Sequence, residues 1–476
     1  MAELERKDIQ GIVVSAYKHL PCAAYVLLRV TDPPKARSWL GQRVTEVTAS
    51  ENKHASLSIN LAFTCSGLKN LGLSRDVLAT FSLPFQEGMA VPYRSRLLGD
   101  NDENDPSRWD WGTSDHPVDI LLLLFAKDEA TLNSALAREQ SAFPTGGVEQ
   151  VKVLQAGRQP NTHEHFGFAD GIGQPVMEGT GNKQRQLERT NHATELPVGE
   201  FLLGHPNVYK VIAPSPAVAG AADPQQLLPV IPADATGLNA EAGMHDLGRN
   251  GSYLVFRQLS QRVASFWQFL DKATCAPNGV SNPEARDRLG AKFVGRYKSG
   301  APLVLSPQHD DPALQNENNF AYYDKDPNGF ACPIGSHIRR ANPRDSLGPD
   351  PATALNSANR HRILRRGRSY GLHLEDVMID DSKERGLHFI CLNSDIERQF
   401  EFVQQTWINN PVFAGLDGEV DPLVGNLKKG DSVFTVQAEP LRQRVHGLSR
   451  FVVMKGGAYF FLPGVQALKY LASLRS

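Results

Sequence analysis

The sequence predicts an α+β fold made of two ferredoxin-like domains with antiparallel sheets. One reason is the length of 476 residues, which exceeds the usual size of a single hydrophobic core. Another is a β-α-β-β-α-β order of strand and helix patterns in the early part of the chain. A less regular version of the same order returns in the second half, so we expect two similar domains.

The first repeat consists of four strand patterns and two helix patterns. The strands are expected at 24–30, 57–63, 118–126 and 148–154, and the helices at 35–43 and 128–140. The first and third strands are continuous apolar runs, which are typical of buried strands, whereas the other two alternate apolar and polar residues. This order is the split βαβ arrangement of ferredoxin-like folds. An extra helix at 67–73 and a polar loop at 99–115 separate its second and third strands.

The second repeat is less clearly marked. Its strands are expected at 251–258, 360–366, 386–392 and 451–461, and its helices at 261–274 and 395–407. In the last helix, apolar residues follow helical spacing, which indicates a buried face. We place the N-terminal domain at 1–200 and the C-terminal domain at 201–476, with the Pro-, Ala- and Gly-rich segment 205–246 as a linker or insertion.

Composition excludes several classes of protein. Hydrophobic residues make up 41% and charged residues 21%, as in ordinary globular proteins. The balance of 50 basic and 52 acidic residues gives no overall attraction to nucleic acid or to an anionic membrane. Five scattered cysteines form no Cys-x-x-Cys pair, which favours a reducing compartment, and no apolar run is long enough to span a bilayer. We therefore expect a cytoplasmic protein without nucleic-acid or membrane partners.

Asp170 is the acidic residue of an unusual glycine-rich segment, HFGFADGIGQP at 165–175. Taken alone, an Asp-Gly pair most often forms a turn, because glycine tolerates positive φ and aspartate bonds to its own backbone. The segment lacks the third glycine of a dinucleotide-binding fingerprint, so a Rossmann interpretation fails. The turn and a functional carboxylate both remain open from these residues alone.

Two further segments contain isolated charged or titratable groups. In RHRILRRGRS, residues 360–369, alternation along a strand sends arginines to both faces, so some point inward and need an anionic partner. In FACPIGSHIRRANPRD, residues 330–345, His337 stands alone. A lone histidine is more often structural than a metal ligand, because ligation needs other groups around it.

Together, the three segments resemble the dye-decolourising peroxidases, a family of haem enzymes. The resemblance rests on Asp170 in Gly-x-x-Asp-Gly, His337 in PIGSHIRRANPRD and Arg365 in RILRRGRSYG, and further similar segments extend it from about Asp8 to Pro463. The length is similar to that of the longer bacterial and fungal-type branch. The resemblance implies two ferredoxin-like domains in a barrel-like arrangement, with helices around a haem cleft.

The resemblance also implies roles for individual residues. It makes His337 the proximal ligand of one non-covalent haem b, Asp170 the distal acid-base residue, Arg365 its charged neighbour, and Gly171 a position of close backbone approach to the haem. The absence of Cys-x-x-Cys-His agrees, since it excludes covalent attachment. The hydrogen-bond acceptor for His337 stays open among Asp395, Glu401 and Asp421.

Other residues are assigned more loosely. Ile390 and Leu392 are expected to wall the distal pocket, and either Arg339 or Arg344 to pair with a haem propionate. Tyr370, and after it Trp407, are candidates for surface electron transfer, although packing is the commoner role of aromatic residues.

The expected activity is reduction of hydrogen peroxide coupled to oxidation of bulky aromatic donors such as anthraquinone or azo dyes and phenols. The alternatives are a haem carrier or iron-releasing, deferrochelatase-like protein on the same fold, and a haem-free scaffold. The expected state is a monomer or homodimer.

Overall fold

The computed structural model describes residues 4–52, 55–158, 163–180, 195–232, 243–428 and 430–474. Its first half contains the expected β-α-β-β-α-β order as β1 (Cys22–Val30), α2 (Pro33–Val44), β2 (Leu57–Phe63), β3 (Ile120–Ala126), α7 (Glu129–Ala142) and β4 (Val148–Gly157). Asp32 and Asp128 cap the two helices, because their side chains accept N–H bonds from the first turns. The sheet order is β4-β1-β3-β2, all antiparallel. This half of the fold prediction is confirmed.

The second half repeats this sheet order. Its strands are β9 (Ser252–Gln261), β10 (Leu364–Arg365), β11 (Arg368–Tyr370), β12 (Gly386–Asn393) and β15 (Val452–Leu462). Strands β10 and β11 both pair with the same edge of β12 and replace the single strand expected at 360–366. Strand β12 pairs with β9, and β9 with β15. The order across this half is therefore β15-β9-β12, followed by β10 and β11. If β9 is counted as the first strand, this is the order fourth-first-third-second, which is also the order β4-β1-β3-β2 of the first half.

The two half-sheets join into a closed barrel. Single residue pairs link them at both seams, Phe461 with Phe63 and Ser369 with Gly157. One core cluster takes alternate residues from strands of both halves, among them Tyr25, Leu123 and Phe256, and fills the inner face. The opposite strand faces pack against helices, including α2 and α7. The fold is therefore α+β with two ferredoxin-like halves in one barrel, as expected.

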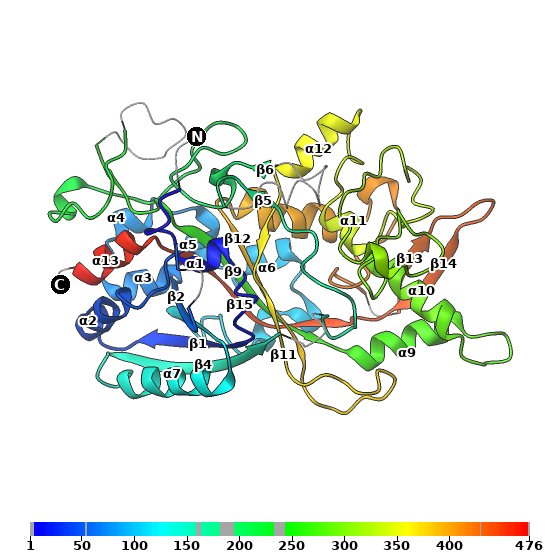
Figure 1. Cartoon of the computed structure of the whole chain (residues 1–476), viewed down its shortest axis with the longest axis horizontal. Helices are drawn as coiled ribbons and strands as arrows, with labels where there is room; N and C mark the ends of the chain where they lie inside the picture. Colours follow the sequence, from blue (N-terminus) through cyan, green and yellow to red (C-terminus); the bar gives the residue numbers. More distant parts are fainter. Residues whose placement is uncertain are drawn as a thin grey trace.

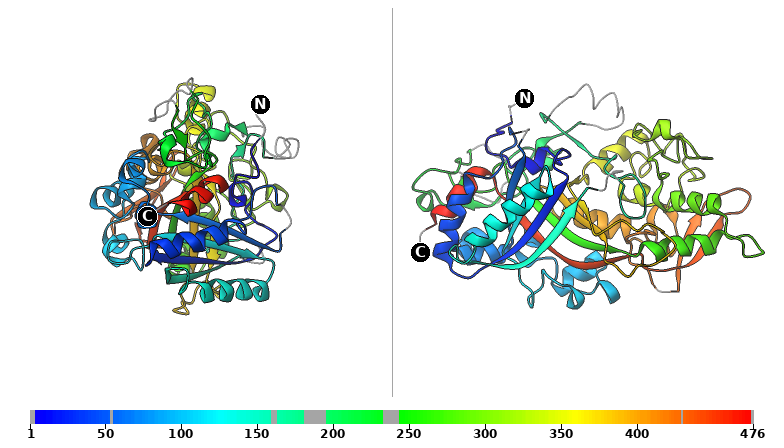
Figure 2. Two further views of the ribbon diagram at one scale, coloured as in Figure 1. Left: turned by 90° about the vertical axis from the view of Figure 1, so that its left-hand side faces the viewer. Right: turned by 60° about the horizontal axis from the view of Figure 1, so that its bottom comes forward.

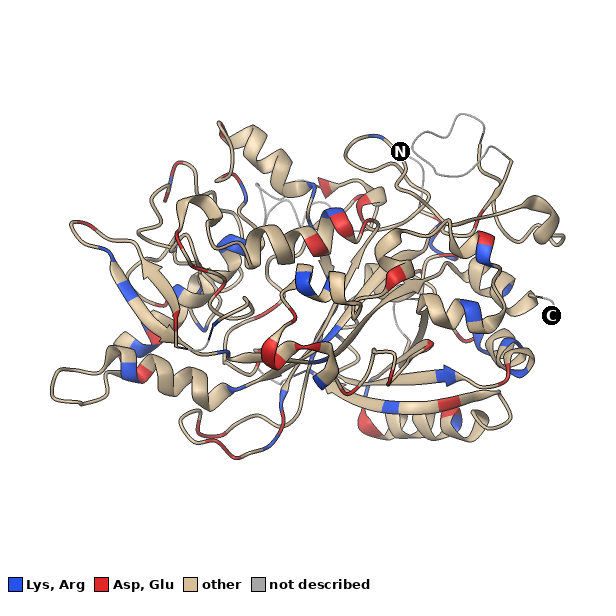
Figure 3. Cartoon of the chain, turned by 180° about the vertical axis from the view of Figure 1, so that it is seen from behind, with Lys and Arg blue, Asp and Glu red and all other residues tan. Residues whose placement is uncertain are grey.

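The helices lie in two groups at opposite ends of the molecule (Figures 1 and 2). One group contains α2, α7 and the C-terminal helix α13 (Val465–Ser473), which packs on α2. The other contains α9 (Val263–Thr274), α10 (Pro283–Val294), α11 (His337–Ala341) and the hairpin β13 (Ser432–Val436) to β14 (Gln443–Leu448). Acidic and basic residues are interspersed over the face in Figure 3.

Several segments differ from the expected elements. The helix expected at 67–73 is present as α3 (Cys65–Leu71), and three further short helices that were not expected follow it, α4 (Arg75–Leu78), α5 (Leu83–Glu87) and α6 (Pro92–Leu98). The helix expected at 395–407 is two π-helical segments, η6 (Glu397–Glu401) and η7 (Val403–Ile408). The remaining short elements are α1 (Gly11–Val14), α12 (Pro351–Asn359), β5 (Val176–Met177), β6 (Glu195–Leu196), β7 (Ala217–Val218) and β8 (His245–Asp246).

The segment 205–246 is irregular where it is described, and residues 233–242 lie outside the described part. Leu228 and Val218 belong to the core cluster that contains the helices of the first half, so this part of the segment is packed into that cluster. The boundary near residue 200 stays a prediction. In the described ranges, no helix combines the length and the apolar character needed to cross a bilayer. The cytoplasmic location also stays a prediction.

Candidate active site

His337 begins helix α11 beside a buried carboxylate. Its Nδ1 lies 2.9 Å from Oδ2 of Asp421, while Oδ1 of Asp421 accepts N–H bonds from Leu423 and Val424, each at 2.9 Å. Asp421 is fully buried, which raises its pKa, but the imidazole and the two N–H donors outweigh burial and leave that pKa below its usual value. Asp421 is thus the partner of His337, among the three carboxylates considered. Because Nδ1 is engaged, Nε2 is the nitrogen left to bind a ligand.

The two other carboxylates bind elsewhere. Asp395 caps the segment that follows it by accepting the N–H of Arg398, and Glu401 pairs with Arg94. Burial of His337 lowers its pKa, but the charge and hydrogen bond of Asp421 outweigh burial and raise the pKa above the usual value.

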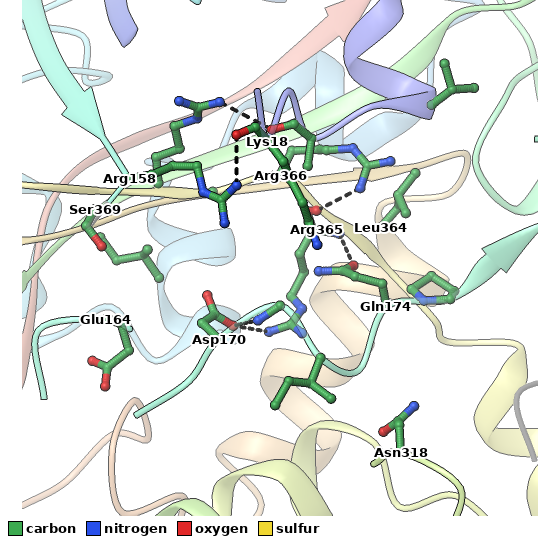
Figure 4. Close-up of a pocket in the computed structure, with 18 of the residues that line it drawn as sticks. Lys18, Arg158, Glu164, Asp170, Gln174, Asn318, Leu364, Arg365, Arg366 and Ser369 are labelled. Carbon is green, nitrogen blue, oxygen red and sulfur yellow. Dashed lines mark hydrogen bonds and ion pairs between the residues drawn. The ribbon is translucent and has the colours of Figure 1, made fainter. Parts of the chain in front are cut away.

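Asp170 and Arg365 form an ion pair at the barrel wall. Arg365 comes from β10, and its Nη1 lies 3.3 Å from Oδ1 of Asp170, which also accepts the N–H of Gly171 (Figure 4). Gly171 has a φ of +82°, which favours glycine, and a Cβ built there would contact nothing within 4 Å. The side chain of Gln174 accepts the backbone N–H of Arg365 and so ties the glycine-rich segment to β10.

One cavity brings the three predicted residues together. This inner cavity has a volume of about 300 Å³ and is lined by His337, Asp170 and Arg365. Its apolar walls come from the late strands, the π-helical segments and the loop after Asp421; they include Leu387, Phe389, Phe400, Val403, Ile408, Leu423 and Met454. Mostly apolar walls with a few convergent polar groups are typical of a cofactor site.

Apart from Arg365 and from Arg257, which pairs with Asp100, three arginines line the inner cavity: Arg296, Arg344 and Arg362. In the described ranges, none of them forms an ion pair, and their bonds go to carbonyl or amide oxygens. Burial, together with the charges of Arg344 and Arg365, lowers the pKa of Arg362 to about 9. Because buried unpaired cations are unfavourable, this group of arginines is suited to an anionic ligand.

An outer cavity of about 480 Å³ adjoins the inner one, and Figure 4 shows many of the side chains that line it. The residues that line both cavities are Glu164, Asp170, Gly171, Ile172, Asn318, Arg365 and Leu387. The outer cavity is strongly cationic, with Lys18, Arg158, Arg366 and Arg368 in its lining. The Asp170–Arg365 pair therefore lies where the two cavities meet.

Three assignments need correction. Arg339 turns away from the cavity to pair with Asp326 at 3.1 Å, so of the two propionate candidates only Arg344 lines it. Ile390 and Leu392 lie in the barrel interior, both with 0% exposure. Alternation along β12 places Leu387 and Phe389 on the cavity side instead. The prediction chose alternate residues of this strand, but it chose the face that lies in the barrel interior.

Neither candidate for surface electron transfer lies at an open surface. Trp407 is only 6% exposed, and Tyr370 is half-buried with an enclosed hydroxyl and its ring stacked on His388 at 4.4 Å. Any contact with a bulky donor would need another exposed residue. Their part in electron transfer stays a prediction.

Sequence reasoning missed Arg362 and Arg296 as lining residues and did not use Glu164. The signal for Arg362 was present in the arginine-rich run, since inward-pointing arginines were expected there. Alternation alone could not tell which arginines face the cavity.

Comparisons with known proteins agree with this fold. Residues 23–160 match the family model described as the DyP dimeric alpha+beta barrel domain. The dye-decolorizing peroxidase msp1 of Mycetinis scorodonius is 31% identical, over 99% of this chain and 88% of its own length. The solved DyP-type peroxidase of Auricularia auricula-judae has a TM-score of 0.77 and 25% identity, covering 99% of this chain and all of that one. A dye-decolorizing peroxidase in complex with 2,6-dimethoxyphenol has a TM-score of 0.76 and 26% identity, with the same coverage.

The barrel and these relatives define a peroxidase of the α+β barrel class. The chain belongs to the dye-decolourising peroxidase family, whose members are haem enzymes.

Proposed function

We propose that this chain binds one non-covalent haem b in the inner cavity, reduces hydrogen peroxide, and oxidises bulky aromatic donors such as anthraquinone or azo dyes and phenols. The donor class is supported by the names of the relatives and by the solved complex with 2,6-dimethoxyphenol. The observation that carries the proposal is the lining of one cavity by an oriented imidazole and by a carboxylate–guanidinium pair.

The residues of the inner cavity fit haem. His337 offers Nε2 to a metal, the apolar walls suit a porphyrin, and Arg344 and Arg362 suit its carboxylates because they lack ion pairs in the described part of the chain. Haem bound there supplies the redox-active iron that takes up the oxidising equivalents of peroxide. Monomer and homodimer both remain compatible with this proposal.

Asp170 acts as the acid-base group in this proposal. Peroxide must lose a proton from one oxygen and gain one on the other, which leaves as water. A carboxylate within about 3 Å of both oxygens can perform both transfers. Arg365 orients Asp170 through their ion pair and stabilises the negative charge that develops as the O–O bond breaks. Asp421 orients the imidazole of His337 and increases its electron donation.

Mixing haem-loaded protein with peroxide in a stopped-flow spectrometer tests this function. The haem absorbance of the wild type should change rapidly, and a dye should then restore it. Asp170→Asn should slow the first change by about 10²- to 10⁴-fold, the usual contribution of acid-base catalysis. An equally fast Asp170→Asn would rule out this mechanism. Slow bleaching of the haem absorbance without dye oxidation would indicate a haem carrier. Failure to bind haem would indicate a haem-free scaffold.

A further inference from the structure

Glu164 is a titratable group at the boundary of the two cavities that the scheme above does not use. It lines both cavities, and Figure 4 shows it near Asp170. In the part of the chain that the structure describes, Glu164 and Asp170 are the two carboxylic acids that line either cavity. Any proton carried by a carboxylic acid between the cavities therefore involves these two side chains.

Hydrogen bonds hold Glu164 in place. Its Oε2 accepts the N–H of Phe166 at 2.8 Å and Nε2 of Gln261 at 2.7 Å, and its Oε1 accepts the N–H of Phe168 at 2.9 Å. The backbone of the same segment closes on itself, because the N–H of Glu164 donates to the carbonyl of Phe168. The carboxylate is thus fixed within the loop that leads to Asp170.

Glu164 is suited to exchange protons near neutral pH. Burial raises its pKa, the three donors lower it, and the charge of Asp170 raises it further, so that the pKa is about 7. Lys18, Arg158, Arg365, Arg366 and Arg368 line the outer cavity, and His163 and Asp170 are the other titratable groups there. These cations disfavour hydronium in the outer cavity, whereas a neutral carboxylic acid carries a proton without adding positive charge.

The atom balance of the reaction shows that protons must enter the inner cavity from outside. One peroxide and two donors AH give two waters and two radicals A•. Asp170 forms the first water with protons that peroxide itself brings. The second oxygen atom leaves as water only after it has gained two electrons and two protons. A donor oxidised outside the inner cavity releases its protons to solvent, so Asp170 must be reloaded with protons from outside.

We propose that Glu164 is the relay residue that reloads Asp170 with protons from the outer cavity while the donors are being oxidised. This inference rests on the proposed function. No hydrogen bond joins the two carboxylates, so the proton passes through water in the shared space between them. Each transfer leaves Glu164 ionised, and solvent in the outer cavity returns its proton.

The test uses Glu164→Gln in the haem-loaded full chain. Glutamine keeps the shape of the side chain and one acceptor oxygen, so it can retain one of the two backbone N–H bonds, but it cannot release a proton. The peroxide step should stay within about twofold of the wild type, while reduction by ferrocyanide, a donor without protons, should slow by about tenfold or more. Reduction in the wild type should slow as the pH rises through 7, where Glu164 loses its proton, and this pH dependence should be absent from the variant.

Gln261→Met provides the matched control. It removes one hydrogen-bond donor to Glu164 but keeps the carboxylic acid. Because that donor lowers the pKa of Glu164, the pH dependence should move to higher pH instead of disappearing. A purely structural role would give both variants the same uniform loss. Infrared titration of the resting protein offers a readout other than activity. A carboxylic C=O band lost near pH 7 should be present in the wild type and absent from Glu164→Gln.

Unchanged ferrocyanide reduction in Glu164→Gln, or equal slowing of both steps, would overturn the relay. If the haem spectrum of the wild type did not respond to peroxide, the proposed function itself would be refuted, and the relay with it.

Discussion

His337 and Asp421 form a hydrogen-bonded pair between segments 84 residues apart in the chain. The acceptor is completely buried and held by two backbone N–H groups, so it cannot turn away from the ring. A carboxylate fixed in this way selects the imidazole tautomer with its proton on Nδ1 and makes Nε2 a stronger electron donor. The pair therefore connects the start of a short helix to the chemistry proposed for the inner cavity.

Asp421→Asn should weaken that donation. The negative charge is lost, and one amide oxygen cannot accept from both the imidazole and the two backbone N–H groups that the two carboxylate oxygens serve. Changes to such supporting residues typically cost 10- to 100-fold, so we expect the peroxide step to slow by about that factor and the ferric/ferrous midpoint potential to rise. Stopped-flow rates and a potentiometric titration measure the two effects. An unchanged potential would contradict the role assigned to Asp421.

Arg362→Leu should have opposite effects on the haem-free and haem-loaded proteins. The haem-free protein should become more stable, because a partly buried cation without an ion pair in the described ranges has been removed. Haem should dissociate about tenfold faster or more, since one partner of its carboxylates is lost. Thermal unfolding of both forms and haem transfer to a competing binder measure these effects. The exposed Arg29→Gln is the control, and equal destabilisation of both forms would count against an anion site.

Most strands of the barrel could be predicted closely because their patterns are local; the strand expected at 360–366 is the exception. Strand β2 has the bounds expected from alternation alone, and the buried run of β3 differs by only two residues at its start. The short helices between them contain too few turns to produce a periodic pattern. The π-helical segments were expected as one α-helix, because the spacing of apolar residues does not distinguish these two backbone geometries.

The site could be predicted only in part, because its residues converge from distant segments. Asp170 and Arg365 are 195 residues apart, and no local pattern relates them; their assignment came from the resemblance. Choosing Asp421 among three carboxylates required the path of the chain after η7. Strand alternation likewise defines two faces of β12 but not which one meets the cavity.

The two faces of β12 should respond differently to substitution. Phe389→Ala enlarges the inner cavity and should shift the haem absorbance and speed the entry of small ligands such as cyanide. Ile390→Val removes one methylene from the barrel interior and should cost about 1 kcal/mol of stability, with an unchanged haem spectrum. Absorption spectra, cyanide binding rates and urea unfolding measure the two outcomes. A spectral shift in Ile390→Val that matched the one in Phe389→Ala would contradict the observed register.

Acid should destabilise the fold through histidines buried in their neutral form. His388 lies against Tyr370, Tyr25 and Phe256, and burial lowers its pKa to about 3. Burial likewise lowers the pKa of His165 to about 4. An unfolded histidine has a pKa near 6.5, so below that pH the unfolded chain binds protons that the folded chain rejects.

The resulting loss of stability should begin near pH 6.5 and continue down to the folded pKa values, at about 1 kcal/mol per pH unit for each ring. His388→Phe keeps the aromatic contacts but removes the titrating group, so its unfolding free energy should decline less steeply between pH 6 and 4.5 than that of the wild type. Carboxylates that titrate in this range are common to both proteins and cancel in the comparison. Urea unfolding at several pH values measures the slope, with the exposed His116→Gln as a control that should retain the wild-type slope. If His388→Phe also retained it, the ring would have to accept a proton in the folded state, contrary to the enclosed aromatic surroundings described above.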